Sequence, residues 1–458
     1  MDTAQNNEPR LGTTQLLAYA APTVALQAML VPLYNFLPPV YYSAEVGMVA
    51  LTVATIFALG RFWEALIDPI VGGLSDRTTA RFGRRRTWML AGLPIAVLSA
   101  WFLLHPPAGA SVFYLLAWLM VFYAGWTMVY VPHQSWGGEL SDDYAERTRI
   151  AGFRESGAFV GYLAATLVGI FYWIWFKGVA FPSYAQIVTS IGVFFMIALP
   201  LAILWCFSRV PAVESRSERT PSFAELFGII VRNAPFRRLI SAYLIDRFAM
   251  GIYFGVQPIL ISQALGLHQH VLTVALVNTV AAVLLAPLWI PLSARLGKHR
   301  AYCLANVLTA VAYASLFFVP SGMILPVLLA NVVLAFGNGG TLITPPAMTA
   351  DAVDADELQT GSAQMGGHMA FLVSVFKFGM GLGLFAGLLF LSLFGYTDMS
   401  QEVGGEVARG VRLGVSFLPA VLLLLPIALM WRYPIDAQRH AEIRKKLAVQ
   451  REVVSKRS

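Results

Sequence analysis

The chain has 458 residues, of which 57% are hydrophobic and only 12% are charged, and its mean hydropathy is +0.66. Soluble globular domains carry about 25% charged residues, so this composition excludes an ordinary soluble protein and indicates a membrane protein. The net charge of +7 is typical of basic loops beside a membrane, and we expect no nucleic-acid partner.

Apolar stretches long enough to cross a bilayer recur along the chain. A transmembrane helix needs about 20 predominantly apolar residues, and twelve such stretches lie between Leu16 and Trp431. The predicted spans are 13–42, 46–75, 86–105, 110–134, 150–176, 186–208, 238–264, 270–295, 300–319, 323–350, 366–396 and 410–432. The sequence therefore predicts an all-α membrane protein with twelve transmembrane helices.

Basic residues gather on alternate loops. One set of loops holds Arg10, the turn from Arg77 to Arg86, Arg147, Arg149, the loop from Arg295 to Arg300 and the tail from Arg432 to Arg457, whereas the other holds only Lys177, Arg409 and Arg412. Basic residues stay on the cytoplasmic side during insertion, so we expect both termini in the cytoplasm. The start of the chain lacks the pattern of a cleaved signal peptide, and the first span is expected to be retained.

A polar interruption divides the spans into two groups of six. We predict an N-terminal half at 1–208, a cytoplasmic linker at 209–237, a C-terminal half at 238–432 and a basic cytoplasmic tail at 433–458. Leu74-Ser75-Asp76-Arg77 is echoed by Leu292-Ser293-Ala294-Arg295, and a basic turn follows each, at Gly83 and at Gly297. Two pseudo-repeated six-helix halves match the major facilitator fold.

The loop after the second span resembles the signature of that superfamily, Gly-x-x-x-Asp-Arg-x-x-x-Arg-x-Gly-Arg-Arg. Asp76 can pair with an arginine or a helix end, which predicts a charge latch that closes the cytoplasmic side. The alternative is a basic loop that only sets topology. Asp351, Asp354, Asp356 and Glu357 form either a matching gate or a solvated acidic loop. The predicted gating residues are Asp76, Arg77, Arg81, Arg84, Glu139, Arg295 and Asp351.

Three charged residues lie within the second span. An ionisable side chain at membrane depth costs about 2.5 to 3.5 kcal/mol on insertion scales and usually has a function. Arg61, Glu64 and Asp68 follow the spacing i, i+3, i+7 and so share one helical face. Two carboxylates one turn apart suit a small cation or a shared proton. The alternative is a structural pair between Arg61 and Glu64.

Four segments carry a narrower resemblance, to the glycoside-pentoside-hexuronide:cation symporter family (melibiose permease-like) of the major facilitator superfamily. They are Arg61 to Pro69, its continuation to Arg86, Glu139 to Arg149 with Arg154 beyond, and Ala350 to Gly361 with Lys377 beyond. The resemblance implies a secondary active transporter that imports a sugar, sugar acid or glycoside with a cation by alternating access.

The same resemblance implies which residues bind the ion. In the family, two acids of helix 2 and a threonine of helix 4 hold it, and the matching residues are Glu64, Asp68 and Thr127. Glu64 replaces the usual aspartate and is one methylene longer. The coupling ion, Na+ or H+, stays open, and no other cofactor or metal is expected.

The residues matching the family's solute site depart further from its pattern. Gln27, Tyr130 and Gln134 stand where sugar transporters have an aspartate on helix 1 and an aspartate with an aromatic on helix 4, while Arg154 and Lys377 are kept. With Arg61 they complete the predicted substrate-binding set. Unopposed Arg154 and Lys377 would favour an acidic or amphipathic solute. The alternatives are therefore a transporter of an acidic amphiphile, lipid or aromatic metabolite, or a non-transporting sensor.

Other polar groups within the spans point less clearly to a function. Asp246 and Arg247 are adjacent, so they lie about 100° apart on a helix and are expected to seek different partners. His133 is expected to be a hydrogen-bonded core residue, with a proton-titrating group as the alternative. No phosphate loop or nucleophile motif is present, so an enzyme is not expected. We expect a monomer in a bacterial inner membrane whose partners are a small solute, the coupling cation and the bilayer.

Overall fold

The computed structural model describes residues 10–35, 41–43, 46–141, 144–173, 177–178, 183–212, 228, 232–360, 365–397 and 403–455. Throughout these ranges the regular elements are helices, and none is a strand. The all-α prediction is therefore confirmed. Two compact units are present: Met1–Met48 with Phe62–Thr220, and Val49–Arg61 with Pro221–Ser458. Most of the predicted linker, 213–227 and 229–231, lies outside the described residues.

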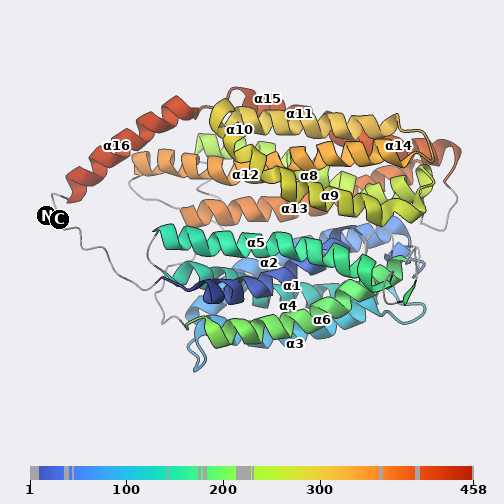
Figure 1. Cartoon of the computed structure of the whole chain (residues 1–458), viewed down its shortest axis with the longest axis horizontal. Coiled ribbons are helices and arrows are strands. Elements are labelled where there is room, and N and C mark those ends of the chain that lie inside the picture. Colours follow the sequence, from blue (N-terminus) through green and yellow to red (C-terminus); the bar gives the residue numbers. More distant parts are fainter. Residues whose placement is uncertain are drawn as a thin grey trace. The chain divides into compact units, whose positions relative to one another are not determined.

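The first unit is built from long helices (Figure 1). They are α1 (Thr13–Asn35), α2 (Ala50–Arg77), α3 (Arg84–Leu104), α4 (Val112–Glu139), α5 (Tyr144–Phe171) and α6 (Tyr184–Arg209), and the first turns of α2 belong to the second unit. The pairs α3–α4 and α1–α5 have the largest contacts. Glycine permits both: a Cβ at Gly125 would lie 2.5 Å from the Ala96 nitrogen, and one at Gly161 would lie 2.4 Å from the Val24 oxygen.

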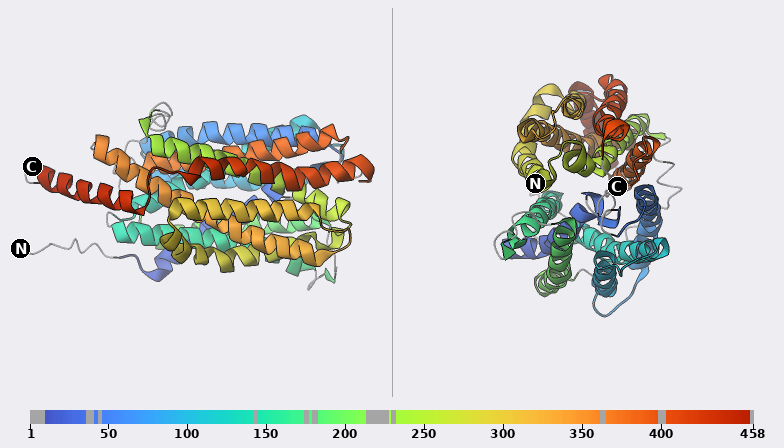
Figure 2. Two further views of the ribbon diagram at one scale, coloured as in Figure 1. Left: turned by 90° about the horizontal axis from the view of Figure 1, so that it is seen from above. Right: turned by 90° about the vertical axis from the view of Figure 1, so that its right-hand side faces the viewer.

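The second unit repeats this plan. Its elements are α8 (Ala234–Ile259), η3 (Leu260–Ala264), η4 (His268–His270), α9 (Val271–Leu285), η5 (Ala286–Leu288), α10 (Trp289–Leu296), α11 (Lys298–Phe317), α12 (Ile324–Thr360), α13 (Met365–Leu393), α14 (Gly405–Leu422), α15 (Leu424–Trp431) and α16 (Ala437–Ser455). The right panel of Figure 2 views its helices nearly end-on. Its largest contacts join α8 to α13 and α11 to α12. The pair α8–α13 consists of the seventh and eleventh predicted spans and corresponds to α1–α5 of the first unit. The pair α11–α12 consists of the ninth and tenth predicted spans and corresponds to α3–α4.

The helices follow the predicted spans with two interruptions. Among the described residues, ten helices are long and apolar enough to cross a membrane, and α5 and α11 lie at the two remaining predicted spans. The eighth span, predicted as continuous, is interrupted by the short turn η5 because Pro287 has no N–H for an α-helical hydrogen bond. The twelfth span is interrupted at Leu423, between α14 and α15.

The sequence echo corresponds to a repeated backbone turn. Gly83 begins α3 with φ 88° and ψ 143°, and Gly297 begins α11 with φ 86° and ψ 144°. Side chains other than glycine rarely adopt this conformation, so glycine allows both sharp turns. The two turns place a basic residue at the start of the following helix, Arg84 in one unit and Lys298 in the other.

Candidate functional site

A carboxylate and a hydroxyl meet between α2 and α4 of the first unit. The Thr127 hydroxyl donates a hydrogen bond of 2.8 Å to Asp68 Oδ1. Thr127 is fully buried and Asp68 is half-buried. Glu64 lies one turn earlier on α2 and is only 1% exposed. The structure thus brings together Asp68 and Thr127, two of the three predicted cation ligands, and keeps the third on the neighbouring turn.

Lys377 lies on α13 of the second unit, and Arg61 of α2 packs against the same stretch of this helix. Arg61 is 5% exposed and Lys377 is 9% exposed. A Cβ at Gly381 would lie 2.5 Å from Arg61 Cγ, so the glycine makes room for the arginine. Lys377 and Gly381 are four residues apart and share one face of α13. This face therefore brings two basic side chains into one region.

Arg154 on α5 lies beside aromatic residues of two other helices. It is close to Tyr19 on α1 and to Tyr130 on α4. Its Nη2 atom is 2.7 Å from Oε1 of Glu155, a side chain that is 61% exposed. The expectation that Arg154 is unopposed is therefore wrong. The adjacent glutamate, Glu155, is a sequence signal that the interpretation did not consider.

The remaining predicted solute residues lie on the same pair of helices. Gln27 on α1 is 9% exposed and packs against α5, where a Cβ at Gly161 would lie 3.0 Å from its own Cβ. Gln134 on α4 is half-buried, one turn beyond Tyr130. Tyr130 stacks on Trp126 with ring centroids 6.3 Å apart. Tyr130, which is close to Arg154, and Gln134 therefore place neutral hydrogen-bonding groups on successive turns of α4.

His133 is a core residue. It is 1% exposed, its ring stacks on Tyr19 at 4.7 Å, and its Nε2 lies 2.8 Å from the Tyr19 carbonyl oxygen. The prediction of a hydrogen-bonded core histidine is confirmed.

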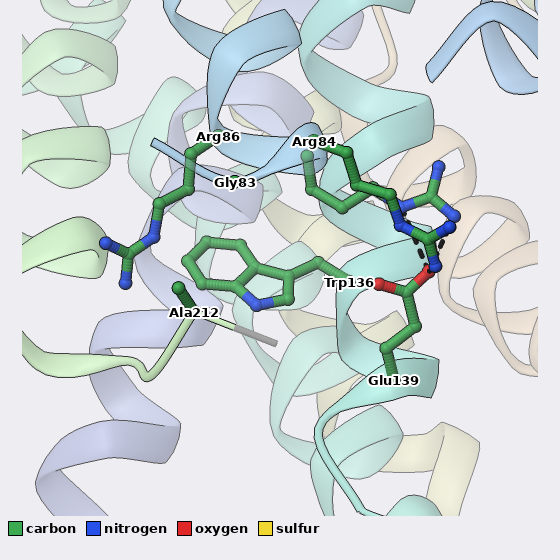
Figure 3. A pocket seen from close by; sticks show the side chains of 7 residues that line it. Gly83, Arg84, Arg86, Trp136, Glu139 and Ala212 are labelled. Atoms are coloured by element: carbon green, nitrogen blue, oxygen red, sulfur yellow. Dashed lines mark hydrogen bonds and ion pairs between the residues drawn. The ribbon is translucent and has the colours of Figure 1, made fainter. Parts of the chain in front are cut away.

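The basic turn after α2 forms a compact ion-pair cluster. Glu139 Oε1 lies 2.7 Å from Arg84 Nη2 and 2.6 Å from Arg85 Nη2. Arg85 Nη2 is also 2.5 Å from Asp76 Oδ1. The predicted pairing of Asp76 with an arginine is confirmed, and the partner is Arg85. Figure 3 shows Arg84 and Glu139 at this turn.

The neighbouring arginines Arg77, Arg81 and Arg86 have other surroundings than Arg84 and Arg85. Arg86 lies 5.1 Å from the Trp136 ring centroid and donates a hydrogen bond to the Val210 carbonyl, where the chain leaves α6. Trp136 lies between Arg86 and the Arg84 cluster in Figure 3. Arg77 and Arg81 are exposed. Arg77 ends α2, where a positive charge favours the helix C-terminus.

The matching turn of the second unit holds a different cluster. Lys298 Nζ is 2.6 Å from Asp351 Oδ1, and His440 of α16 lies 3.3 Å from Asp351 Oδ1 and 3.0 Å from Asp354 Oδ2. Asp351 is only 6% exposed. The alternative of a solvated acidic loop is therefore wrong for Asp351 and Asp354. Arg295 is exposed.

A buried ion pair lies deep in the second unit. Arg247 Nη2 is 2.8 Å from Asp246 Oδ2, with side-chain exposures of 1% and 3%. The Tyr302 hydroxyl donates a 3.0 Å hydrogen bond to the same carboxylate oxygen, and Arg247 also donates to Thr341. The expectation of different partners is wrong. The long arginine side chain can bend back to its neighbour, and separating the charges inside the bundle would leave both unpaired.

Paired helical units with charged groups inside apolar helices define a polytopic membrane protein of the secondary-transporter class. The family described as MFS/sugar transport protein matches residues 18–437, so the chain belongs to this family. The assignment to the major facilitator superfamily is thereby confirmed.

Several relatives that align with most of this chain are named as symporters or carriers. An uncharacterized symporter of Synechocystis is 25% identical and aligns with 96% of this chain and 97% of its own. A glucuronide carrier protein homolog of Escherichia coli is 28% identical over 88% of each chain. A sodium-dependent lysophosphatidylcholine symporter of Danio rerio is 26% identical over 87% of this chain and 81% of its own.

Solved transporters share the fold. A bacterial homolog of the human lysosomal transporter Spinster, in an inward-facing and unoccupied conformation, superposes with a TM-score of 0.65 at 15% identity. The match covers 94% of this chain and 97% of that one. The protein is thus a multi-pass membrane transporter with the major facilitator fold.

Proposed function

We propose that the protein is a cation-coupled symporter whose ion site contains Glu64, Asp68 and Thr127. The observation that carries the proposal is the 2.8 Å hydrogen bond from Thr127 to Asp68, which joins two helices at a carboxylate. Oxygen ligands suit a small hard cation, as they do for other hard metal ions. Binding would offset the repulsion between the two acids.

We favour Na+ over H+ as the coupling ion. A proton needs only a carboxylate, whereas the Thr127 hydroxyl adds a neutral oxygen that can coordinate a metal ion. The names of several relatives describe them as sodium-dependent symporters, which supports this choice. In this proposal H+ coupling is the alternative outcome of the experiment below.

The proposed solute is a sugar acid or glucuronide. Arg154 and Lys377 supply positive charge for a carboxylate, while Gln27, Tyr130 and Gln134 can both donate and accept hydrogen bonds with hydroxyl groups. Glu155 already pairs with Arg154. The solute would therefore compete with Glu155 for the guanidinium, a switch that could link binding to alternating access.

The cluster of Asp76, Arg84, Arg85 and Glu139 is the proposed cytoplasmic latch. Each of its ion pairs lies within the first unit and ties the ends of α2, α3 and α4 together. Lys298 and Asp351 are the proposed counterpart in the second unit. The basic loops support cytoplasmic termini in a bacterial inner membrane.

Transport by purified protein in liposomes tests this function. Uptake of a radiolabelled glucuronide is measured under an inward Na+ gradient, an inward H+ gradient or neither, in the wild type and in Asp68→Asn. We expect Na+-driven accumulation that falls at least about tenfold in the variant, because the ion loses a charged ligand. Accumulation driven only by H+ would reassign the ion. Equal uptake by both proteins in every gradient would contradict the proposed ion site.

A lysophospholipid is the second candidate solute. The aspartates of sugar transporters are replaced by Gln27 and by neutral residues of α4, and several relatives are named as lysophosphatidylcholine symporters. Labelled lysophosphatidylcholine is therefore assayed in the same liposomes. Na+-dependent movement of this lipid without glucuronide uptake would replace the sugar-acid assignment and retain the ion site.

A further inference from the structure

A groove on the second unit is lined almost entirely by apolar side chains. The lining residues are Leu288, Pro291, Leu292, Arg295 and Phe336. Four of them follow the spacing i, i+3, i+4, i+7 along the end of η5 and α10, so they form one stripe on one helical face. Phe336 comes from α12. The stripe begins at Leu288 and ends at the guanidinium group of Arg295.

The wall of this groove is held rigidly. Trp289 is fully buried, stacks on Phe336 at 4.8 Å, and donates a 2.6 Å hydrogen bond from Nε1 to the Phe336 carbonyl. A Cβ at Gly340 would lie 2.6 Å from Trp289 Cε2, so only a glycine there admits the indole. The groove is thus preformed rather than opened by a ligand.

The helix that carries the stripe has unusually few buried residues. Only 22% of the apolar window in His268–Leu296 is buried, the lowest share among the described spans. Leu288 is 51% exposed and Ile290 is 63% exposed. Apolar side chains with this much exposed surface favour contact with hydrocarbon. An acyl chain therefore fits the long part of the stripe.

The charged end of the stripe suits a phosphate. Arg295 is exposed and, within the described part of the chain, makes no ion pair, whereas nearby Lys298 is 2.6 Å from Asp351. A guanidinium presents several donors in one plane and binds phosphate well. Arg295 lies in the last turn of α10, at the end of the predicted eighth span, where we expect lipid headgroups.

We propose that this groove binds one anionic phospholipid, with an acyl chain along Leu288, Leu292 and Phe336 and its phosphate at Arg295. Charge complementarity selects the occupant: the apolar stripe accepts any acyl chain, but the exposed guanidinium group of Arg295 favours a lipid with net negative charge. The inference requires only that the chain spans a membrane and is independent of the transported solute and of the coupling ion.

Lipid binding to the full-length protein tests the proposal. Delipidated protein in detergent is titrated with phosphatidylglycerol or with phosphatidylcholine of the same acyl chains, and bound lipid is counted by native mass spectrometry. The variants are Arg295→Gln, Leu292→Trp, which fills the groove, and Arg300→Gln, a control that removes an exposed cation outside the lining. Thermal unfolding of each variant verifies folding.

We expect one tightly bound phosphatidylglycerol, an affinity about fivefold lower in Arg295→Gln, and nearly unchanged binding in Arg300→Gln. Leu292→Trp should displace the lipid without removing the charge. Equal binding of the two lipids to the wild type, or equal losses in the two arginine variants, would overturn the proposal. Competition by soluble glycerol phosphate would also overturn it, because it would indicate a site for phosphate alone.

Discussion

Two aspartates within the predicted membrane spans, one in each unit, have different partners. Asp246 in the second unit lies 2.8 Å from the guanidinium of the next residue and accepts a hydrogen bond from Tyr302. Asp68 in the first unit is half-buried and accepts a 2.8 Å hydrogen bond from the neutral hydroxyl of Thr127. Asp246 has a guanidinium group within its own helix, whereas Asp68 accepts a hydrogen bond from a hydroxyl of another helix, and we propose that this hydroxyl and Asp68 share a cation from solution.

We propose that this difference separates a structural charge, at Asp246, from a functional one, at Asp68. A fully buried ion pair contributes little net stability, but loss of one partner leaves a charge that the bundle cannot solvate. A half-buried acid bonded to a hydroxyl tolerates neutralisation, because a neutral amide can accept the same hydrogen bond. Charge removal at Asp246 or Arg247 should therefore lower the stability of the second unit. Charge removal at Asp68 should instead weaken ion coupling and leave the first unit folded.

The largest expected effect is on the stability of the second unit. Arg247→Leu should lower the free energy of unfolding by about 3 to 5 kcal/mol, because Asp246 is left buried and unpaired. The double variant Asp246→Leu with Arg247→Leu should recover most of the loss. Thermal unfolding of purified protein measures both. A double variant no more stable than the single one would show that packing of Arg247, rather than charge, dominates.

The two glycine turns provide a matched test of the repeat. Gly83→Ala and Gly297→Ala should each cost about 1 to 3 kcal/mol, because both residues have a positive φ in a region that is largely restricted to glycine. A Cβ at Gly138 has open space around it and Gly138 has no positive φ, so Gly138→Ala is the control. Melting temperatures give the comparison, and a neutral effect at either turn would break the structural equivalence of the two.

A smaller stability effect is expected at Thr127. Thr127→Val removes the hydrogen bond to Asp68 with little change in shape and should cost about 1 kcal/mol, while Thr127→Ser should retain most of it. Thr166→Val is the control, since that buried hydroxyl donates, among the described residues, to the Tyr162 carbonyl of its own helix. Sodium affinity should fall in Thr127→Val and be unaffected in Thr166→Val. Equal sodium affinity in these two variants would remove Thr127 from the site.

The smallest expected effect is a pH dependence at the basic turn of the second unit. Burial, and then the charge of Arg300, lower the pKa of His299, while Asp436 opposes the shift. Its contribution to stability is therefore complete above the unfolded pKa of about 6.5 and is lost as the pH falls through that value towards the folded pKa. His299→Gln should flatten the melting temperature between about pH 7 and pH 5. An unchanged slope would assign the pH dependence to other groups.

Much of the fold could be predicted from the sequence because hydrocarbon imposes simple rules on length and polarity. The echo between 74–77 and 292–295 also indicated the two turns, since both glycines adopt the same backbone conformation. The break at Pro287 was visible in the sequence as a proline but was hidden within an apolar run. Hydropathy reports how apolar the side chains are and does not detect that Pro287 lacks the backbone N–H needed for an α-helical hydrogen bond.

The candidate site was only partly predictable. Asp68 and Thr127 were placed together through a resemblance to a known family, and the structure joins them. The partner of Arg247 was missed because helical angles describe where Cα–Cβ bonds point, whereas an arginine side chain is long enough to reach its sequence neighbour. The pairing of Arg154 with Glu155 is a contact of the same kind, which the sequence interpretation did not consider. The α10 groove depends on contact between helices far apart in sequence, which no local pattern encodes.

Stabilisation of the purified protein by sodium is the sharpest test of the proposed ion site at Asp68. Melting temperatures are measured with increasing NaCl against choline chloride at equal ionic strength, for the wild type, Asp68→Asn and the charge control Glu442→Gln, an exposed side chain of α16. We expect a saturable stabilisation, about 2.7 kcal/mol at 100 times the dissociation constant, in the wild type and Glu442→Gln but not in Asp68→Asn. The same sodium response in Asp68→Asn as in the wild type would contradict the proposed ion site.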